Sequence, residues 1–156
     1  MKTLVVYYSR TQTTEKVAKM IKDELNCDIE SIKPIKNYDG KLGYARGGFE
    51  SSTKKLPGIE NPEKDPSEYD LVIIGTPVWA STMASPVLTY LRHNNGKFNN
   101  VAFFDTAGGS GVESTFKKLE QETKKPLQTL GLTREDMKDY EEKTQKFVED
   151  LKKLMN

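Results

Sequence analysis

Four hydroxyl side chains lie close together near the start of the chain, in Ser9-Arg10-Thr11-Gln12-Thr13-Thr14. The apolar run Leu4–Tyr8 precedes this stretch, and a helical pattern begins near Glu15. A helix N-terminus carries unpaired N–H groups and the positive end of the helix dipole, so it suits an anion such as phosphate. Neither common glycine-rich nucleotide fingerprint is present. The stretch predicts either a phosphate site or an ordinary strand–helix turn with Thr11 or Thr13 as the helix cap.

Two further loops follow buried strands. The strongest buried-strand pattern, Leu71–Gly75, leads into Thr76-Pro77-Val78-Trp79-Ala80, which holds the only tryptophan. The run Val101–Phe104 leads into Asp105-Thr106-Ala107-Gly108-Gly109-Ser110-Gly111. If these strands neighbour the first one in a parallel sheet, all three loops meet at one edge. Together the loops would offer a binding site for phosphate, an aromatic side chain and exposed backbone amides. This combination suits a planar, phosphorylated aromatic ligand.

Composition narrows the classes of function. The 156 residues carry a net charge of +1, which gives no reason to expect nucleic acid or an anionic membrane as a partner. No apolar run reaches the length of a membrane span, and the chain begins without a signal-peptide pattern. With Cys27 and His93 as the single residues of their types, we expect no disulfide and no metal site. We therefore expect a reduced, soluble, cytoplasmic protein.

Strand and helix patterns alternate along the chain. Alternation of this kind predicts a parallel sheet covered by helices on both faces. We expect one domain spanning residues 1–156. Residues 36–70 are irregular, with a weak helix over 41–53 that carries Leu42, Ala45 and Phe49 on one side. The other expected elements are strands at 3–8, 28–35, 71–75, 101–104 and 126–132, a helix from Glu15 to Asn26, a helix capped by Ser85 with Pro86 first, a helix carrying Val112, Phe116 and Leu119, and a last helix after a capping box at Thr133–Asp136.

The three loops together resemble those of the flavodoxins, and the resemblance covers essentially the whole chain. The family's first loop typically reads Ser/Thr-x-Thr-Gly-x-Thr and holds the phosphate of FMN, the second offers an aromatic residue to the flavin, and the third supplies backbone contacts. The resemblance implies an α/β, flavodoxin-like three-layer sandwich with a five-stranded parallel sheet of order 2-1-3-4-5, and FMN as cofactor. It implies neither a catalytic residue nor a metal ligand. The implied cofactor-binding residues are Ser9, Arg10, Thr11, Gln12, Thr13, Thr14, Thr76, Pro77, Val78, Trp79, Ala80, Thr106, Ala107, Gly108 and Gly109.

The resemblance implies a low-potential electron-transfer protein that works between redox partner proteins, and we expect a monomer. The alternative is an FMN-dependent NAD(P)H oxidoreductase acting on a quinone or similar acceptor. Compact length favours the electron carrier, whereas the lack of an aromatic residue in the third loop leans toward the enzyme. A flavin-free module of the same fold is disfavoured, because the first loop holds neither the acidic residues nor the cysteine that such modules use.

The resemblance to flavodoxins also leads to two expectations about the site and draws attention to the charge of the chain. Trp79 is expected to stack on the flavin ring, in a site with few cations. Gln12 stands where the family usually has glycine, so the backbone there is expected not to need a positive φ angle. The near-zero net charge departs from the strongly acidic surface usual in electron-carrier flavodoxins.

Overall fold

The computed structural model describes residues 1–36, 38–53 and 56–156. Its centre is a parallel sheet in the order β2-β1-β3-β5-β6. A short strand, β4 (Thr82–Met83), pairs antiparallel with the end of β3. Counting the parallel strands alone, this order is the predicted 2-1-3-4-5, so the predicted fold class is confirmed. The parallel strands are β1 (Thr3–Tyr7), β2 (Asp28–Ser31), β3 (Leu71–Trp79), β5 (Val101–Ala107) and β6 (Thr129–Thr133).

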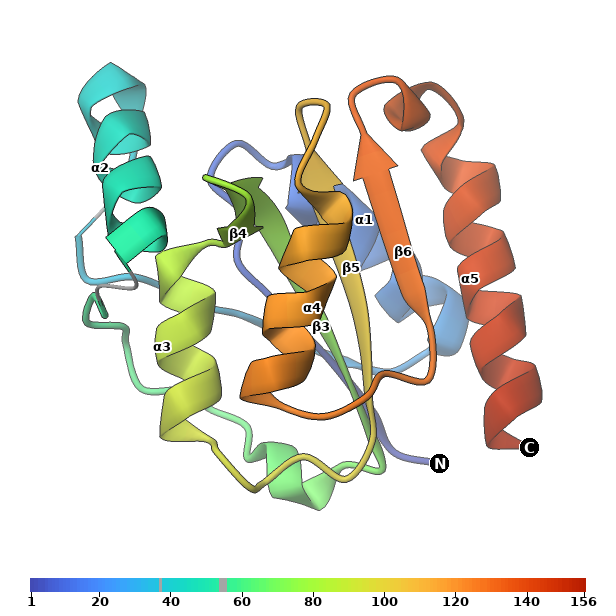
Figure 1. Cartoon of the computed structure of the whole chain (residues 1–156). Coiled ribbons are helices and arrows are strands. Elements are labelled where there is room, and N and C mark those ends of the chain that lie inside the picture. The colour runs from blue at the N-terminus through green and yellow to red at the C-terminus, as the bar shows by residue number, and fades with distance from the viewer. Residues whose placement is uncertain (37, 54–55) are drawn as a thin grey trace.

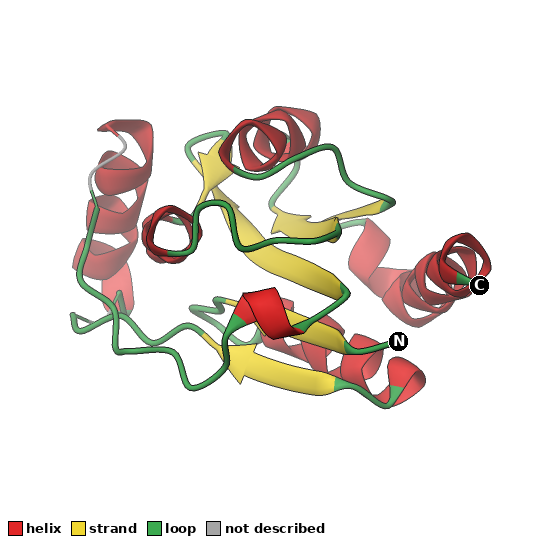
Figure 2. Cartoon of the chain, turned by 90° about the horizontal axis from the view of Figure 1, so that it is seen from below, coloured by secondary structure: helices red, strands yellow, loops and turns green. Residues whose placement is uncertain are grey.

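Helices cover both faces of the sheet, as Figures 1 and 2 show. Helices α1 (Thr13–Leu25) and α5 (Tyr140–Met155) pack on one face, and α3 (Ser85–His93) and α4 (Val112–Glu122) pack on the other. Helix α2 (Gly40–Thr53) stands beyond α3 at one side of the molecule (Figure 1). Two short 3-10 helices, Pro66–Glu68 and Asp136–Asp139, lead into β3 and α5.

The central strands have apolar residues on both faces, which explains their continuous apolar sequences. On one face Val5, Ile73 and Phe104 pack with Ile21 of α1 and Phe147 of α5. Their neighbours along each strand form a second cluster under α3 and α4. The carboxyl ends of β1, β3 and β5 are thereby held rigidly side by side, which positions the three loops that follow them.

Helix α2 packs through its glycines. A Cβ atom at Gly43 would lie 2.2 Å from the backbone of Tyr38, so only glycine allows this approach. Gly43 and Gly47 are both buried. The apolar side chains that the sequence places on one side of this helix face solvent instead, with Leu42 88% and Phe49 62% exposed.

Two predicted helix caps have different outcomes. Ser85 is wrong as a cap, because Ala84 is the N-cap of α3 and Ser85 is its first residue. The Thr133–Asp136 box is confirmed: the Thr133 N–H donates to Asp136 Oδ2 at 2.9 Å, and the Asp136 N–H donates to Thr133 Oγ1 at 3.3 Å. This box opens the 3-10 turn that leads into α5, so the chain enters the helix one turn later than predicted.

Candidate cofactor site

A cleft of about 490 Å³ lies at the carboxyl edge of the sheet, the edge toward which the β6 arrow points in Figure 1. Its walls come from all three loops that the sequence singles out. The predicted site residues that line it are Arg10, Thr11, Thr13, Thr14, Pro77, Val78, Trp79, Thr106, Ala107 and Gly108. The topology therefore brings together segments that are up to about a hundred residues apart along the chain.

The first loop turns into α1 through a left-handed residue. Gln12 is the N-cap of α1 with φ 72°, and no described side chain caps this helix. The expectation that Gln12 avoids a positive φ is therefore wrong, as are Thr11 and Thr13 as caps. A left-handed conformation costs a non-glycine residue roughly 1–2 kcal/mol, and the tight turn between β1 and α1 imposes it whatever residue stands there. Because the N-cap side chain makes no capping hydrogen bond in the described structure, the first N–H groups of α1 remain available to an anion.

A buried hydrogen bond joins the first and third loops. The hydroxyls of Thr14 on α1 and Thr106 on β5 lie 2.8 Å apart, and both residues are buried. Since Thr14 belongs to the first turn of α1, this contact fixes that helix end against the end of β5. The two sides of the cleft therefore have a fixed spacing.

The second loop is a hairpin. Strand β3 continues to Trp79, which pairs with Thr82 of β4 across the two-residue loop Ala80–Ser81. Ala80 and Ser81 have φ angles of 50° and 60°. Positive φ at both central positions is what a type I′ hairpin turn requires. The usual Asn-Gly signal for such a turn is missing, which is why the sequence does not reveal the hairpin.

Trp79 belongs to an aromatic cluster as well as to the cleft. Its side chain is 7% exposed, and its ring centroid lies 5.4 Å from that of Tyr8 and 5.1 Å from that of Tyr38. A Cβ atom at Gly47 of α2 would lie 2.8 Å from the indole, so the missing side chain there lets α2 close over the ring. Most of the indole is thus core, and the remainder faces the cleft.

Five predicted site residues do not line the cleft: Ser9, Gln12, Thr76, Ala80 and Gly109. Thr76 instead organises the second loop, because its hydroxyl donates to the Pro77 carbonyl at 2.8 Å and accepts from the Ala84 N–H at 2.9 Å. Gly109 lines a separate shallow hollow at the start of α4. The Ser9 hydroxyl is buried without a partner among the described residues.

The structure adds four residues that the sequence analysis missed: Lys16, Leu132, Arg134 and Met137. With Arg10, three cationic side chains of the described residues line the cleft, so the expectation of few cations is wrong. Lys16 follows Thr13 by three residues on α1, and this spacing was a usable signal because such residues share a helix face. The other three come from the end of β6 and the turn after it, which only the folded sheet brings to the cleft.

A buried carboxyl group directly precedes one of the residues that line the cleft. Asp105 precedes Thr106 on β5, is fully buried, and has no hydrogen-bond partner for either carboxyl oxygen among the described residues. Burial, with a smaller contribution from the charge of Glu113, raises the pKa of Asp105 to about 8. The carboxyl group is therefore mostly neutral at pH 7.

Comparison with known proteins identifies the family. A family model described as flavodoxin matches residues 2–150. The chain belongs to the flavodoxin family. No curated protein matches it. Among the described residues, no helix combines the length and the apolar character that crossing a membrane would require.

Solved structures extend the comparison. A Bacteroides eggerthii protein assigned as a flavoprotein is 25% identical, with a TM-score of 0.75 over 94% of this chain and 97% of that one. A Lactobacillus acidophilus flavoprotein in complex with FMN is 27% identical, with a TM-score of 0.70 over 88% and 95%. A flavodoxin from the domain Archaea shares the fold at 18% identity, with a TM-score of 0.55 over 97% and 99%. The family and the FMN complex of this relative bear out FMN as the cofactor that the sequence predicts.

Proposed function

We propose that the chain binds FMN in the cleft and acts as a low-potential electron-transfer protein between redox partner proteins. The observation that carries this proposal is the uncapped N-terminus of α1, which meets Trp79 and Gly108 in one cleft. A volume of about 490 Å³ lies within the usual range of roughly 300–1,000 Å³ for ligand pockets. The family membership supports the same cofactor.

The residues of the cleft fit the two ends of FMN. The hydroxyls of Thr11 and Thr13 and the N–H groups at the start of α1 would hold the phosphate, with Arg10 and Lys16 supplying positive charge. Trp79 and the backbone at Gly108 would border the flavin ring. When bound, FMN supplies electron-transfer chemistry, and the protein contributes orientation and electrostatics.

The cleft favours a carrier over an enzyme. The charged side chains that line it among the described residues are Arg10, Lys16 and Arg134. They would stabilise negative charge, and the described lining includes no histidine, carboxylate or cysteine side chain, the groups that most often exchange protons in catalysis. Electron transfer between proteins needs no such group, whereas reduction of an organic acceptor consumes protons.

The second candidate is an FMN-dependent NAD(P)H oxidoreductase acting on a quinone or similar acceptor. Its support is Arg134, an exposed cation that the turn after β6 adds to the lining of the cleft, where the phosphates of a nicotinamide dinucleotide could dock. The test is to mix the FMN-loaded protein with NADH or NADPH and 1,4-benzoquinone under anaerobic conditions. A carrier leaves the nicotinamide to be oxidised no faster than in the same mixture without protein, whereas an oxidoreductase accelerates its oxidation over many turnovers.

A cofactor titration tests the proposed site itself. The protein without cofactor should quench FMN fluorescence at much lower concentration than riboflavin fluorescence, since only FMN carries the phosphate. Equal affinities for the two flavins would refute the assignment of Ser9–Thr14 as the phosphate loop. No affinity for either flavin would refute the proposed cofactor.

A further inference from the structure

A second cavity, of about 230 Å³, lies at the free edge of β2, between that strand and the segment 59–64. It shares no lining residue with the cofactor cleft. Its wall includes the apolar side chains of Ile32 and Ile59, which are 5% and 9% exposed. Tyr90 of α3 forms another part of the wall.

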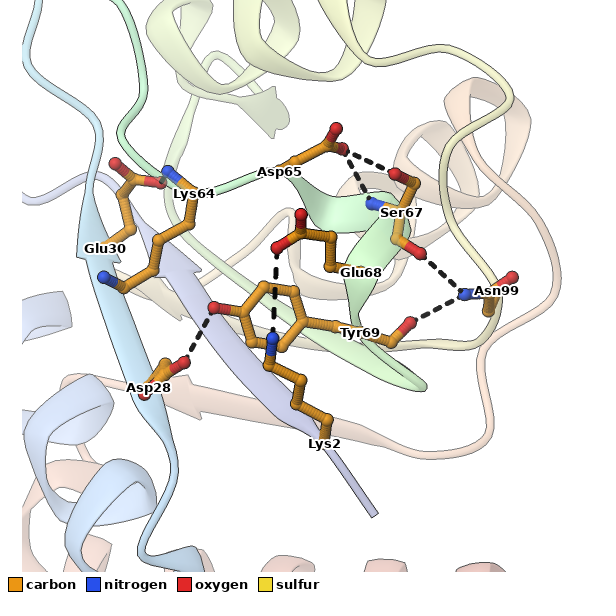
Figure 3. A network of polar contacts seen from close by, with 9 residues as sticks. All are labelled: Lys2, Asp28, Glu30, Lys64, Asp65, Ser67, Glu68, Tyr69 and Asn99. Carbon is orange, nitrogen blue, oxygen red and sulfur yellow. Dashed lines mark hydrogen bonds and ion pairs between the residues drawn. The ribbon is translucent and has the colours of Figure 1, made fainter.

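The segment that closes this cavity is tied to β2 on both sides. The Glu60 N–H donates to the Lys33 carbonyl at 2.8 Å. Three residues later, the Glu30 carboxylate accepts hydrogen bonds from the N–H groups of Glu63 at 2.6 Å and Lys64 at 3.1 Å. Figure 3 shows Glu30 reaching from β2 to Lys64. Between these two attachments the segment stands away from the strand, so the cavity is formed by fixed contacts.

A third attachment lies just outside the cavity. The Tyr69 hydroxyl donates to Asp28 Oδ2 at 2.7 Å, as Figure 3 shows. This bond anchors the chain that follows the segment to the start of β2. Tyr69 does not line the cavity, so it offers a matched control for Tyr90.

The Tyr90 hydroxyl has no hydrogen-bond partner in the part of the chain that the structure describes. The residue is fully buried, and its hydroxyl makes no hydrogen bond with any described residue. Burial, together with the charges of Glu30 and Asp65, raises the pKa of Tyr90, so the group stays protonated and remains a donor. Tyr90 is among the residues that line the cavity. A buried donor of this kind is an unfilled position for an acceptor atom.

The edge of β2 supplies complementary backbone groups. The Ile32 N–H donates to the Tyr7 carbonyl at 2.7 Å, so the backbone of Ile32 faces β1. Because successive residues of a strand present their backbone groups to opposite sides, the N–H and C=O of Ser31 point away from β1, along the cavity. An edge strand presents such groups as a ready donor and acceptor pair.

We propose that this cavity binds a small uncharged molecule that combines an aromatic ring with a primary amide. The amide oxygen accepts from the Tyr90 hydroxyl, the amide NH₂ donates to the Ser31 carbonyl, and the ring lies on Ile32 and Ile59. A dry cavity of about 150 Å³ holds benzene, so 230 Å³ has room for one substituted ring. The charged side chains around the opening are three glutamates and two lysines, which disfavours an anionic ligand.

Benzamide is the probe for the experiment, added to the FMN-loaded protein so that the flavin site is filled. Backbone amide NMR should show saturable shifts within residues 29–33 and 59–64. Tyr90→Phe should weaken benzamide binding about tenfold, since it removes the donor without changing the ring. Tyr69→Phe, which loses a hydroxyl outside the cavity, should bind as the wild type does. Benzoate, equal in shape but anionic, should bind the wild type more weakly than benzamide.

Several results would overturn the proposal. Shifts confined to residues of the cofactor cleft, no saturation, or equal affinity of wild type and Tyr90→Phe would each do so. A crystal structure grown with benzamide that shows an ordered water only on the Tyr90 hydroxyl would also overturn it. The comparison of benzamide with benzoate needs the wild type alone, so the proposal can fail even if a variant does not fold.

Discussion

Replacing Asp105 with Asn should stabilise the fold increasingly as pH rises from acid to neutral. Asp105 is buried on β5, and its pKa is about 8 in the folded chain against an ordinary value of 3.8. Below pH 3.8 the carboxyl is neutral in both the folded and unfolded states, so it adds no pH dependence. Between 3.8 and 8 it ionises only in the unfolded chain, and this ionisation favours unfolding.

The magnitude follows from about 1.4 kcal/mol for each pH unit within that window. At pH 7 the ionisation of the unfolded chain lowers the free energy of unfolding by about 4 kcal/mol, and at pH 5 by about 2 kcal/mol. Asn has the same shape and does not ionise, so it removes this loss. Its amide brings its own unsatisfied donors, which cost roughly 1–3 kcal/mol. That cost does not vary with pH. It therefore shifts the difference in free energy of unfolding between variant and wild type by a constant amount, without changing how steeply this difference rises with pH.

The assay is urea unfolding of wild type and Asp105→Asn, both without cofactor, at several pH values between 4 and 9. The free energy of unfolding of the variant minus that of wild type should rise by about 1.4 kcal/mol per pH unit up to pH 8 and then level off. Asp136→Asn is the control. Hydrogen bonds from Thr133, with help from Lys143, lower the pKa of Asp136 below its ordinary value of 3.8, so wild type should keep a nearly constant advantage over this variant between pH 4 and 9 and lose it only at lower pH.

Two observations would refute the reasoning about Asp105. The first is a free-energy difference between wild type and Asp105→Asn that does not change with pH. The second is a carboxyl ¹³C resonance of Asp105 that titrates near pH 4 in the folded protein. Either would mean that the group is solvated or paired with a cation in solution.

Three further predictions concern the cleft and its supports. Thr14→Ala should weaken FMN binding several-fold more than riboflavin binding, because it alters the phosphate loop; a fluorescence titration that finds equal losses would contradict this. Ala80→Gly should raise the free energy of unfolding in urea by about 1 kcal/mol, because glycine adopts a positive φ without the steric cost that alanine has. Gly48→Ala should stabilise the fold by up to about 1 kcal/mol, whereas Gly47→Ala should destabilise it and change the fluorescence of Trp79, because only position 47 meets the indole. Similar behaviour of the two glycine variants would count against the packing of α2.

The sequence was sufficient for the sheet and for the three loops. Strands such as Leu71–Trp79 are buried on both faces, so their apolar residues are continuous and stand out in the sequence. The loops were visible because hydroxyl groups, a tryptophan and clustered glycines are unusual directly after such strands. Parallel topology then brings the ends of neighbouring strands to one edge, which is why the cleft could be predicted as a whole.

The details that decide the chemistry depend on tertiary structure. Gln12 adopts a left-handed conformation because the β1–α1 turn requires it, although its residue type disfavours it. Arg134 reaches the cleft from the turn after β6, far along the chain, so no local pattern marks it as part of the site. Trp79 is mostly core because Gly47 lets α2 close over the indole. Local sequence thus determined the elements and the loops between them, whereas the packing of distant segments decided which side chains face the cofactor cleft.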